Sequence, residues 1–268
     1  MTSIRQWLND ARDETSRRDA EVLIAHALDS TRAHLYAHAD DALSAAADAR
    51  IRELLDARRR GEPVAYLVGY REFWNLRLAV TPAVLIPRPE TELLVELALE
   101  RTPRGARVVD LGTGSGAIAL AIKSERADCT VVATDASERA LDVARRNAAT
   151  LELSIEIRAG DWYDAVANEP LFDVVVSNPP YVAADDAHLR ALVSEPTAAL
   201  IGGADGLDAL RVIVAGARGR LAAYGTLLVE HGFDQGAAVR RLFEAAGLSA
   251  IETHRDGGGH ERVTLGTR

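Results

Sequence analysis

The amino-acid sequence predicts an α/β fold, in which helices cover both faces of a β-sheet, preceded by a small helical domain. From residue 107 onward, short apolar runs typical of strands alternate with longer segments of helical periodicity. Residues 1–60, in contrast, show helical periodicity throughout. The 268 residues are 48% hydrophobic and 26% charged, a globular composition, and they suffice for one large domain with a smaller partner.

The first part of the chain is expected to consist of helices. Residues 16–19 (SRRD) resemble a capping box, and they precede an apolar stripe at helical spacing between residues 20 and 27. Residues 51–55 repeat this stripe, and a run of arginines followed by Gly61 and Pro63 predicts the end of that helix. We therefore assign residues 1–63 to a helical N-terminal domain.

A β-hairpin is expected next. Between residues 66 and 80 the apolar period shortens toward two, with Asn75 between two candidate strands. Residues 64–82 are accordingly assigned to a linker built on this hairpin. The following segment, 86–101, predicts a helix, because Pro89 suits a first turn and the acidic residues beside it suit the positive helix start.

The rest of the chain, 83–268, is assigned to the main α/β domain. Its strands are expected at 107–111, 130–134, 154–158, 172–177 and 225–230, and its helices at 116–124, 137–149, 205–221 and 234–246. Two short strands, 250–254 and 261–265, are expected at the end, joined by a glycine-rich turn at 257–259.

Charge and cysteine content narrow the classes of function. The formal net charge is −9, whereas a nucleic-acid-binding protein is expected to carry a basic face. No apolar run approaches the length of a membrane span, and the polar N-terminus contains no signal-peptide core. Cys129 is the only cysteine, which excludes an internal disulfide and disfavours a structural zinc site. We expect a cytoplasmic monomer that binds neither a metal, a membrane nor nucleic acid.

A glycine-rich turn joins the first strand of the main domain to its helix. Its residues are Gly112, Thr113, Gly114, Ser115 and Gly116. Alternating glycines let the backbone approach a ligand closely, and the helix that follows presents free N–H groups. The same residues also fit the G-x-G-x-x-A fingerprint of dinucleotide-binding proteins.

Two further strand ends supply polar and aromatic groups. Asp135 ends the second strand, where a carboxylate can accept hydrogen bonds from ribose hydroxyls. Asp161 and Trp162 follow the third strand, where an acid can accept from an exocyclic amine and an indole can stack on a purine. Together these residues predict an adenosine pocket at the carboxyl edge of the sheet, which fits either a dinucleotide or S-adenosylmethionine.

The fourth strand ends in Asn178-Pro179-Pro180-Tyr181. The proline after Asn178 restricts that residue to extended geometry, and prolines offer carbonyl acceptors without N–H donors. The Asn178 side-chain oxygen and the Pro179 carbonyl can therefore each accept a hydrogen bond from one N–H of a planar –NH₂ group, while Tyr181 covers the plane of that group. This arrangement predicts methyl transfer to an amide or amino nitrogen, in which alignment supplies most of the acceleration.

These motifs resemble those of class I S-adenosylmethionine-dependent methyltransferases that act on –NH₂ groups. Four more segments are similar to the peptide chain release factor glutamine methyltransferases (the HemK/PrmC family). They are GEPVAYLVG at 61–69, VLIPRPETE at 84–92, EPTAALIGGADGL at 195–207 and LLVEHGFDQ at 227–235. The resemblance spans the chain from about residue 60 to its end, with a looser match in RRDAEVLIAHAL.

The resemblance implies a doubly wound, Rossmann-like sheet of seven mostly parallel strands with a reversed last strand. It implies transfer of a methyl group to the side-chain amide nitrogen of the glutamine in the Gly-Gly-Gln motif of class 1 release factors, a step that serves translation termination. The glycine turn, Gly112 through Gly116, would hold the methionine part of the cofactor, Asp135 the ribose, and Trp162 the adenine, with Asp161 and Asn178 as further cofactor-binding residues. Asn178, Pro179, Pro180 and Tyr181 would hold the substrate amide, and the N-terminal domain would bind the partner.

Three alternatives remain open at this point. An amino-methyltransferase acting on a nucleic-acid base would use the same pocket, although the acidic charge disfavours it. An NAD-dependent oxidoreductase would use the glycine turn but would leave Asn178–Tyr181 unexplained. A non-catalytic adaptor for a release factor would need neither the glycine turn nor Asn178.

Overall fold

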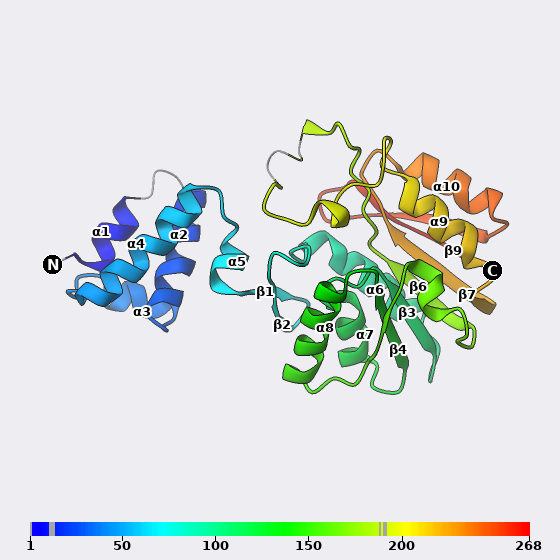
Figure 1. Ribbon diagram of the computed structural model, residues 1–268, viewed down its shortest axis with the longest axis horizontal. Helices are drawn as coiled ribbons and strands as arrows, with labels where there is room; N and C mark the ends of the chain where they lie inside the picture. The colour runs from blue at the N-terminus through cyan, green and yellow to red at the C-terminus, as the bar shows by residue number, and fades with distance from the viewer. Residues whose placement is uncertain (1, 11–13, 188, 190–191) are drawn as a thin grey trace. The chain divides into compact units, whose positions relative to one another are not determined.

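The structure is a computed structural model that describes residues 2–10, 14–187, 189 and 192–268. The chain divides into two compact units, Met1–Tyr70 and Arg71–Arg268, which are described separately (Figure 1). The boundary falls inside the segment predicted as a linker. Among the described residues, no helix is both long and apolar enough to cross a membrane.

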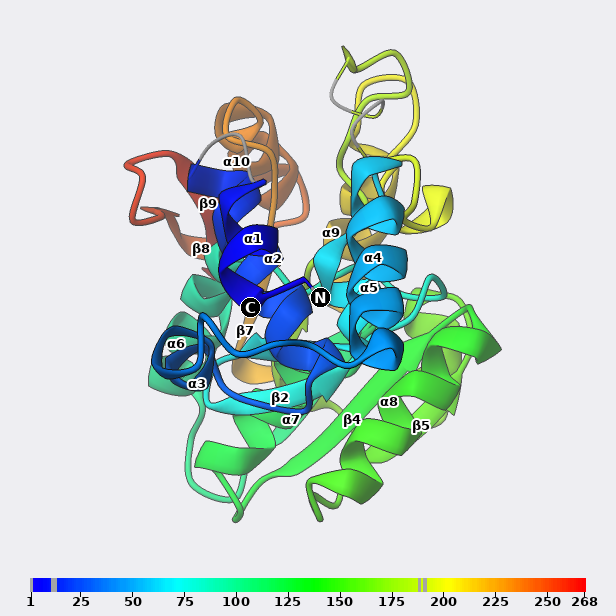
Figure 2. The same cartoon turned by 90° about the vertical axis from the view of Figure 1, so that its left-hand side faces the viewer.

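The N-terminal unit consists of short helices. They are α1 (Ile4–Asn9), α2 (Glu14–Ala27), α3 (Arg32–Ala37), α4 (Ala45–Arg59) and α5 (Val64–Val68). Helices α2 and α4 lie side by side (Figures 1 and 2), and Leu23, Ile24 and Ile51 are fully buried between the helices of this unit. The structure confirms the prediction that this region is helical.

Two local expectations in this region were wrong. The capping box is formed by Ser3 and Gln6 at the start of α1, whereas Ser16 lies within α2, which already begins at Glu14. The hairpin was expected from residue 66, but residues up to Val68 form helix α5, which ends at Gly69 in the left-handed conformation (φ 79°). The apolar run 64–68 is compatible with either period, so it could not be assigned from periodicity alone.

The second unit opens with the expected hairpin, β1 (Tyr70–Phe73) and β2 (Leu76–Ala79), whose turn contains Asn75. A 3₁₀-turn, η1 (Pro89–Thr91), leads into α6 (Glu92–Arg101), with Pro89 in the first turn as predicted.

The main sheet has seven strands in the order β5-β4-β3-β6-β7-β9-β8. Their bounds are β3 (Arg107–Leu111), β4 (Thr130–Asp135), β5 (Glu156–Ala159), β6 (Phe172–Ser177), β7 (Leu221–Glu230), β8 (Ser249–Arg255) and β9 (Glu261–Thr267). Strands β3 to β7 pair in parallel, whereas β9 runs antiparallel to both neighbours. The expected mostly parallel sheet with a reversed last strand is confirmed.

Helices cover both faces of this sheet. Helices α6 and α7 (Ala117–Glu125) pack on one face, and α8 (Glu138–Thr150) contacts β4 and β5. Helices α9 (Asp208–Ala217) and α10 (Gly236–Ala245) contribute to the core of the other face. Two 3₁₀-turns, η2 (Trp162–Val166) and η4 (Thr197–Ala199), lie in the connections.

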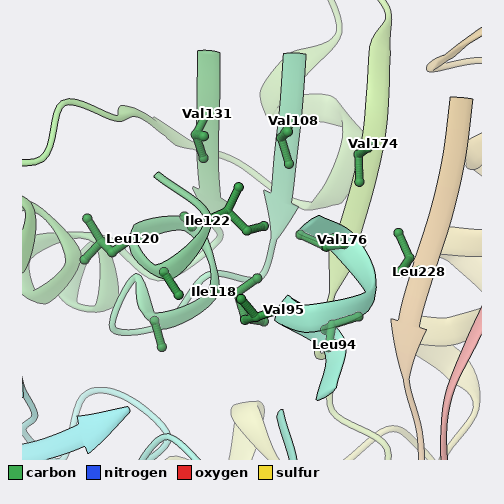
Figure 3. Packing of buried hydrophobic residues seen from close by; sticks show 14 of the residues in the cluster. Leu94, Val95, Val108, Ile118, Leu120, Ile122, Val131, Val174, Val176 and Leu228 are labelled. Carbon is green, nitrogen blue, oxygen red and sulfur yellow. The ribbon is translucent and has the colours of Figure 1, made fainter. Parts of the chain in front are cut away.

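The strands are apolar on both faces, as the burial of a central parallel sheet requires. Val108, Val174 and Val176 face α6 and α7, where they pack with Ile118 and Ile122 (Figure 3). Alternate residues of the same strands, among them Val109 and Val175, belong to the opposite core. Full burial of each such side chain contributes about 1.5–3 kcal/mol, so this double core anchors the strand ends.

Several boundaries in the second half differ from expectation by a few residues, and one difference is larger. The helix predicted at 205–221 begins at Asp208 and ends at Ala217, and Leu221 instead opens β7. Leu221 is fully buried beside Phe172 of β6, so pairing in the sheet overrides its local helical pattern. Residues 200–206, between η4 and α9, form an irregular segment.

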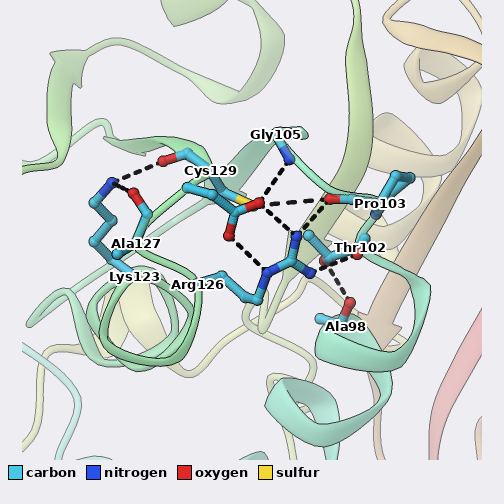
Figure 4. A network of polar contacts seen from close by, with 9 residues as sticks. Ala98, Thr102, Pro103, Gly105, Lys123, Arg126, Ala127 and Cys129 are labelled. Carbon is cyan, nitrogen blue, oxygen red and sulfur yellow. Dashed lines mark hydrogen bonds and ion pairs between the residues drawn. The ribbon is translucent and has the colours of Figure 1, made fainter.

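A cluster of polar contacts lies at the amino ends of β3 and β4, where these strands begin (Figure 4). The Arg126 guanidinium donates to the carbonyl oxygens of Thr102 (2.6 Å) and Pro103 (2.7 Å), and to both oxygens of Asp128. Asp128 also accepts from the Gly105 amide at 2.7 Å, and these bonds lower its pKa. This Arg126 clasp joins the loops that precede the two strands.

Candidate active site

A cavity of about 320 Å³ opens at the carboxyl ends of β3, β4, β5 and β6. In the register of the sheet, Leu111 lies beside Thr134 and Ser177, and Ser177 lies beside Val229. The residues that follow these four strand positions therefore emerge at one edge. Of the residues predicted from the sequence, the cavity is lined by Gly112, Thr113, Gly114, Ser115, Asp135, Asp161, Trp162, Asn178 and Pro180.

The glycine turn adopts a backbone that other residues rarely take. Gly112, Gly114 and Gly116 have φ values of 75°, 56° and 84°, in the left-handed region that favours glycine. The space beside the Cα of Gly114 is open, so the backbone itself forms the cavity wall there. Gly116 instead caps α7 and lies against Ala144 of α8, which makes its role one of close helix packing.

Asn147 of α8 supports this turn from behind. Its buried side-chain amide donates to the carbonyl oxygens of Ser115 (2.9 Å) and Ala79 (3.0 Å), and it accepts from the Ala79 amide at 2.7 Å. The hairpin and the glycine turn are thereby joined through one residue. The sequence alone does not reveal this contact, because Asn147 lies in an ordinary helical pattern.

Asp135 is positioned for a polyhydroxylated ligand. Its Oδ2 accepts from the Gly114 amide at 2.9 Å and its Oδ1 from the Ser137 amide at 2.8 Å. Burial raises its pKa, while these two backbone bonds act in the opposite direction. Each carboxylate oxygen retains a second lone pair, so both can still accept from hydroxyl groups.

Trp162 and Asp161 form the next part of the wall. Trp162 has φ 43°, and its ring lies near Gly112, where an added Cβ would meet the ring at 3.4 Å. The half-buried indole thus shares the cavity with the glycine turn. Asp161 caps the start of η2, with its exposed side chain at the cavity.

Asp110, near the end of β3, is a buried acid beside the glycine turn that sequence reasoning did not single out. It is fully buried, its Oδ2 accepts from the Thr113 hydroxyl at 2.6 Å, and its Oδ1 has no hydrogen-bond partner among the described residues. Burial raises its pKa to about 7. The carboxyl directly follows two valines, and its acidic character inside an apolar strand was the available indication.

The segment Asn178–Tyr181 leaves the sheet directly after β6. The Asn178 Nδ2 donates to the Thr91 hydroxyl oxygen at 3.1 Å, and Pro180 lines the cavity. Pro179 and Tyr181 are not among the lining residues. The Tyr181 hydroxyl donates to Glu230 Oε1 at 3.0 Å, and its ring packs on the core that contains α9 and α10. The predicted covering of a substrate plane by Tyr181 therefore stays a prediction.

The irregular segment 200–206 holds this motif from behind. The Val182 amide donates to the Leu200 carbonyl at 2.9 Å, and the Gly202 amide donates to the Val182 carbonyl at 3.0 Å. Gly202 lies directly against the Pro180 carbonyl oxygen, with no room for a Cβ. Gln235 completes the support, because its Nε2 donates to the Tyr181 carbonyl at 3.0 Å.

A second wall comes from two segments far apart in sequence, 83–91 and 196–199. The buried Glu195 carboxylate joins them: its Oε2 accepts from the Ile86 amide at 3.0 Å, and its Oε1 pairs with the Arg88 guanidinium. Both segments belong to stretches that carried the family resemblance, but their contact could not be inferred from one sequence.

The strand order, the glycine turn and the cavity define a class I S-adenosylmethionine-dependent methyltransferase. Residues 89–205 match the family model described as methyltransferase small domain, and residues 1–69 match that described as PrmC N-terminal domain. A solved structure shows the same fold: the 16S rRNA N2 G1207 methyltransferase of T. thermophilus, in complex with AdoMet and guanosine. It is 21% identical with a TM-score of 0.57, over 74% of this chain and 49% of that one.

Curated relatives define the family. The release factor glutamine methyltransferase of Xylella fastidiosa (strain 9a5c) is 52% identical, over 99% of this chain and 98% of the relative. That of Escherichia coli (strain K12) is 45% identical over 98% of both chains. The chain belongs to the release factor glutamine methyltransferase family.

Proposed function

We propose that this protein transfers a methyl group from S-adenosylmethionine to the side-chain amide nitrogen of the glutamine in the Gly-Gly-Gln motif of class 1 peptide chain release factors. Family membership over nearly the full length supports this function, and so does the placement of Asn178 beside an adenosine-type cavity. The second observation carries the chemistry, since an acceptor pair at this edge suits an –NH₂ substrate.

The residues of the cavity fit the cofactor. Asp135 would accept from the ribose hydroxyls, Trp162 would stack on the adenine, and Asp161 would accept from its exocyclic amine. The backbone of residues 112–116 would hold the methionine portion, next to Asn178. When bound, S-adenosylmethionine supplies an electrophilic methyl group.

The substrate amide is activated by hydrogen-bond acceptors. Amide nitrogen is a poor nucleophile because its lone pair is delocalised into the carbonyl group. The Asn178 Oδ1 and the Pro179 carbonyl oxygen would each accept a hydrogen bond from one N–H of the substrate amide. These two hydrogen bonds would raise the electron density on the amide nitrogen and stabilise the positive charge that develops there during transfer. The same two hydrogen bonds orient the amide nitrogen, and such alignment can lower the free-energy barrier of the transfer by roughly 7–11 kcal/mol.

The remaining proposals concern the binding partner, the cellular location and the oligomeric state of the protein. The helical N-terminal domain serves partner binding, with residues 64–82 as its linker to the catalytic domain. The protein acts in the cytoplasm as a monomer, and it binds the release factor without direct contact to nucleic acid.

The substitution Asn178→Ala tests this proposal. We expect the single-turnover rate of methyl transfer to fall by on the order of 10²–10³-fold, since one preorganised polar partner is lost. Affinity for S-adenosylhomocysteine should stay within about threefold, because the other cavity residues remain. Labelled methyl transfer to a purified release factor measures the rate, and titration calorimetry measures the affinity.

Two controls accompany this test. Asn75→Ala makes the same chemical change at the exposed hairpin turn and should leave transfer unchanged. A Gly-Gly-Glu release factor offers no N–H to the acceptors and should not be methylated; sites built for a specific hydrogen bond discriminate by roughly 10⁴–10⁵-fold. Full turnover by Asn178→Ala, or a methyl group mapped to that glutamate, would refute the acceptor mechanism.

A further inference from the structure

A buried carboxylate lies behind the proposed catalytic residues and is not explained by the reaction. Glu230 ends β7, beside β6, and only 1% of its surface is exposed. Its Oε1 accepts from the Tyr181 hydroxyl at 3.0 Å, whereas its Oε2 is buried without a geometrically regular hydrogen bond among the described residues. Because burying a carboxylate is costly, this placement requires a compensating role.

Thr91 connects this carboxylate to Asn178. Thr91 ends the η1 turn and is 4% exposed. Its hydroxyl oxygen accepts from the Asn178 Nδ2 at 3.1 Å. The same hydroxyl interacts with the Glu230 carboxylate, where it opposes the effect of burial on the pKa of Glu230. These side chains therefore form a chain in which the Thr91–Asn178 hydrogen bond is regular and the Glu230 carboxylate lies within electrostatic reach of the Thr91 hydroxyl.

The chemistry of these groups fixes the direction of the chain. An ionised carboxylate accepts hydrogen bonds but cannot donate, and a hydroxyl has a single proton. If the Thr91 proton points to Glu230, the Thr91 oxygen can only accept from Asn178. Asn178 must then present its Nδ2 to Thr91, and its Oδ1 is left for another donor; among the described residues no hydrogen bond ends on that oxygen.

We propose that Thr91 and Glu230 are positioning residues, which hold the Asn178 amide in the orientation that offers Oδ1 to the substrate nitrogen. This inference rests on the proposed function. An Asn178 side chain turned by 180° would place its –NH₂ group against the substrate –NH₂ group, so that two donors would meet and the substrate nitrogen would lose an acceptor. An asparagine by itself has no strong preference between these two orientations.

The charges around Glu230 are consistent with this role at neutral pH. Burial raises the pKa of Glu230 to about 6, as does the nearby Glu90, whereas Thr91, Tyr181 and the Arg262 guanidinium act in the opposite direction. The carboxyl is therefore ionised above about pH 6. Below that pH it gains a proton that it can donate to Thr91, and the direction of the chain is no longer enforced.

Thr91→Val removes the acceptor for Asn178 at nearly constant side-chain volume. We expect the single-turnover rate of release factor methylation to fall about 10–100-fold, in keeping with the loss of one oriented hydrogen bond. S-Adenosylhomocysteine affinity and the KM for the release factor should stay within about threefold. Thr91→Ser keeps the hydroxyl and should restore the rate, which would not follow if Thr91 served only to fill space.

Glu230→Gln tests the carboxylate. The uncharged amide brings N–H donors beside Thr91 and Tyr181, so the direction of the chain is no longer imposed, although the shape is conserved. We expect a lower single-turnover rate at neutral pH. In wild type we expect activity to fall as the pH drops through about 6. In this variant we expect that fall to be absent.

Thr102→Val is the matched control, because it removes a buried hydroxyl that donates to the Ala98 carbonyl at the end of α6, and Thr102 is not among the residues that line the cavity. Its rate should equal that of wild type. The inference is overturned if Thr91→Val keeps a rate within threefold of wild type, if Thr102→Val loses as much, or if Glu230→Gln matches wild type in rate and pH profile. A wild-type protein that leaves the Gly-Gly-Gln glutamine unmethylated would instead refute the proposed function itself.

Discussion

Asp110 shows what a single residue contributes to both stability and site. Its carboxyl is fully buried under the glycine turn, and burial raises its pKa to about 7 from 3.8. A carboxyl whose pKa is higher in the folded state binds its proton more tightly there. Its favourable contribution to stability is therefore complete below about pH 3.8 and is lost as the pH rises to about 7.

Asp110→Asn should remove this dependence on pH. Between pH 5 and 7, the unfolding free energy of wild type relative to the variant should decrease by roughly 1.4 kcal/mol per pH unit, because one proton is released on unfolding across that range. Urea denaturation at several pH values measures both proteins. Parallel curves for the two proteins would contradict the expectation.

Single site residues could be predicted from the sequence where they lie close to the carboxyl end of a predicted strand. Asp135, Trp162 and Asn178 line the predicted cavity because each lies at or shortly after the carboxyl end of a strand, and parallel strands bring these ends together. Thr91 and Glu230 could not be predicted, since their relation to Asn178 depends on the packing of segments that are far apart in sequence, 87 residues in the case of Thr91. Tyr181 was placed correctly in the motif, but its hydroxyl contact with Glu230 was not foreseen.

At the scale of elements, the segment 200–206 matters because it has no regular structure. Its backbone lies against Asn178–Tyr181 from behind, and Gly202 leaves no space for a side chain beside the Pro180 carbonyl. The helix predicted at 205–221 begins only at Asp208, so residues 205 and 206 also belong to this segment. The amides of Val182 and Gly202 donate to the carbonyl oxygens of Leu200 and Val182, which holds the segment against the motif.

Gly202→Ala should displace the motif. The added Cβ would force apart the carbonyl oxygens of Pro180 and Gly206, and a shift of about 1 Å in a reactive group can lower a rate about 10²-fold. We expect slower single-turnover transfer with nearly unchanged S-adenosylhomocysteine affinity. Gly257→Ala is the control, because Gly257 has open space around its Cα. Equal rates for both variants would show that the segment does not position the motif.

The order of strands and helices was predictable, whereas several ends were not. Apolar runs identified the central strands β3, β4, β6 and β7, because buried parallel strands are apolar on both faces. Ends such as Leu221 depend on the neighbour strand that the residue contacts, and α5 lies in a run too short to show its period. These are tertiary effects, which local sequence does not contain.

At the scale of the whole molecule, two units have cores of their own. The core of the N-terminal unit consists of residues up to Val68, whereas every residue that lines the cavity lies between Phe73 and Ala199. The site is thus built entirely from the second unit. This division is compatible with the proposed role of the first unit in recognition of the partner.

A chain shortened to residues 71–268 should separate these two roles. We expect it to fold, and to bind S-adenosylhomocysteine within about threefold of the full protein. Its KM for an intact release factor should rise, whereas methylation of a short Gly-Gly-Gln peptide should be unaffected. An unchanged KM for the intact release factor, measured by methyl transfer at several substrate concentrations, would contradict a recognition role for the first unit.

The Arg126 clasp and the cavity lie at opposite ends of the same two strands, β3 and β4. Changes at the clasp act on the loops that enter the sheet, and changes at the cavity act on the loops that leave it, with the buried valines of the strands in between. Thermal tolerance and reaction rate are therefore open to separate adjustment in this protein.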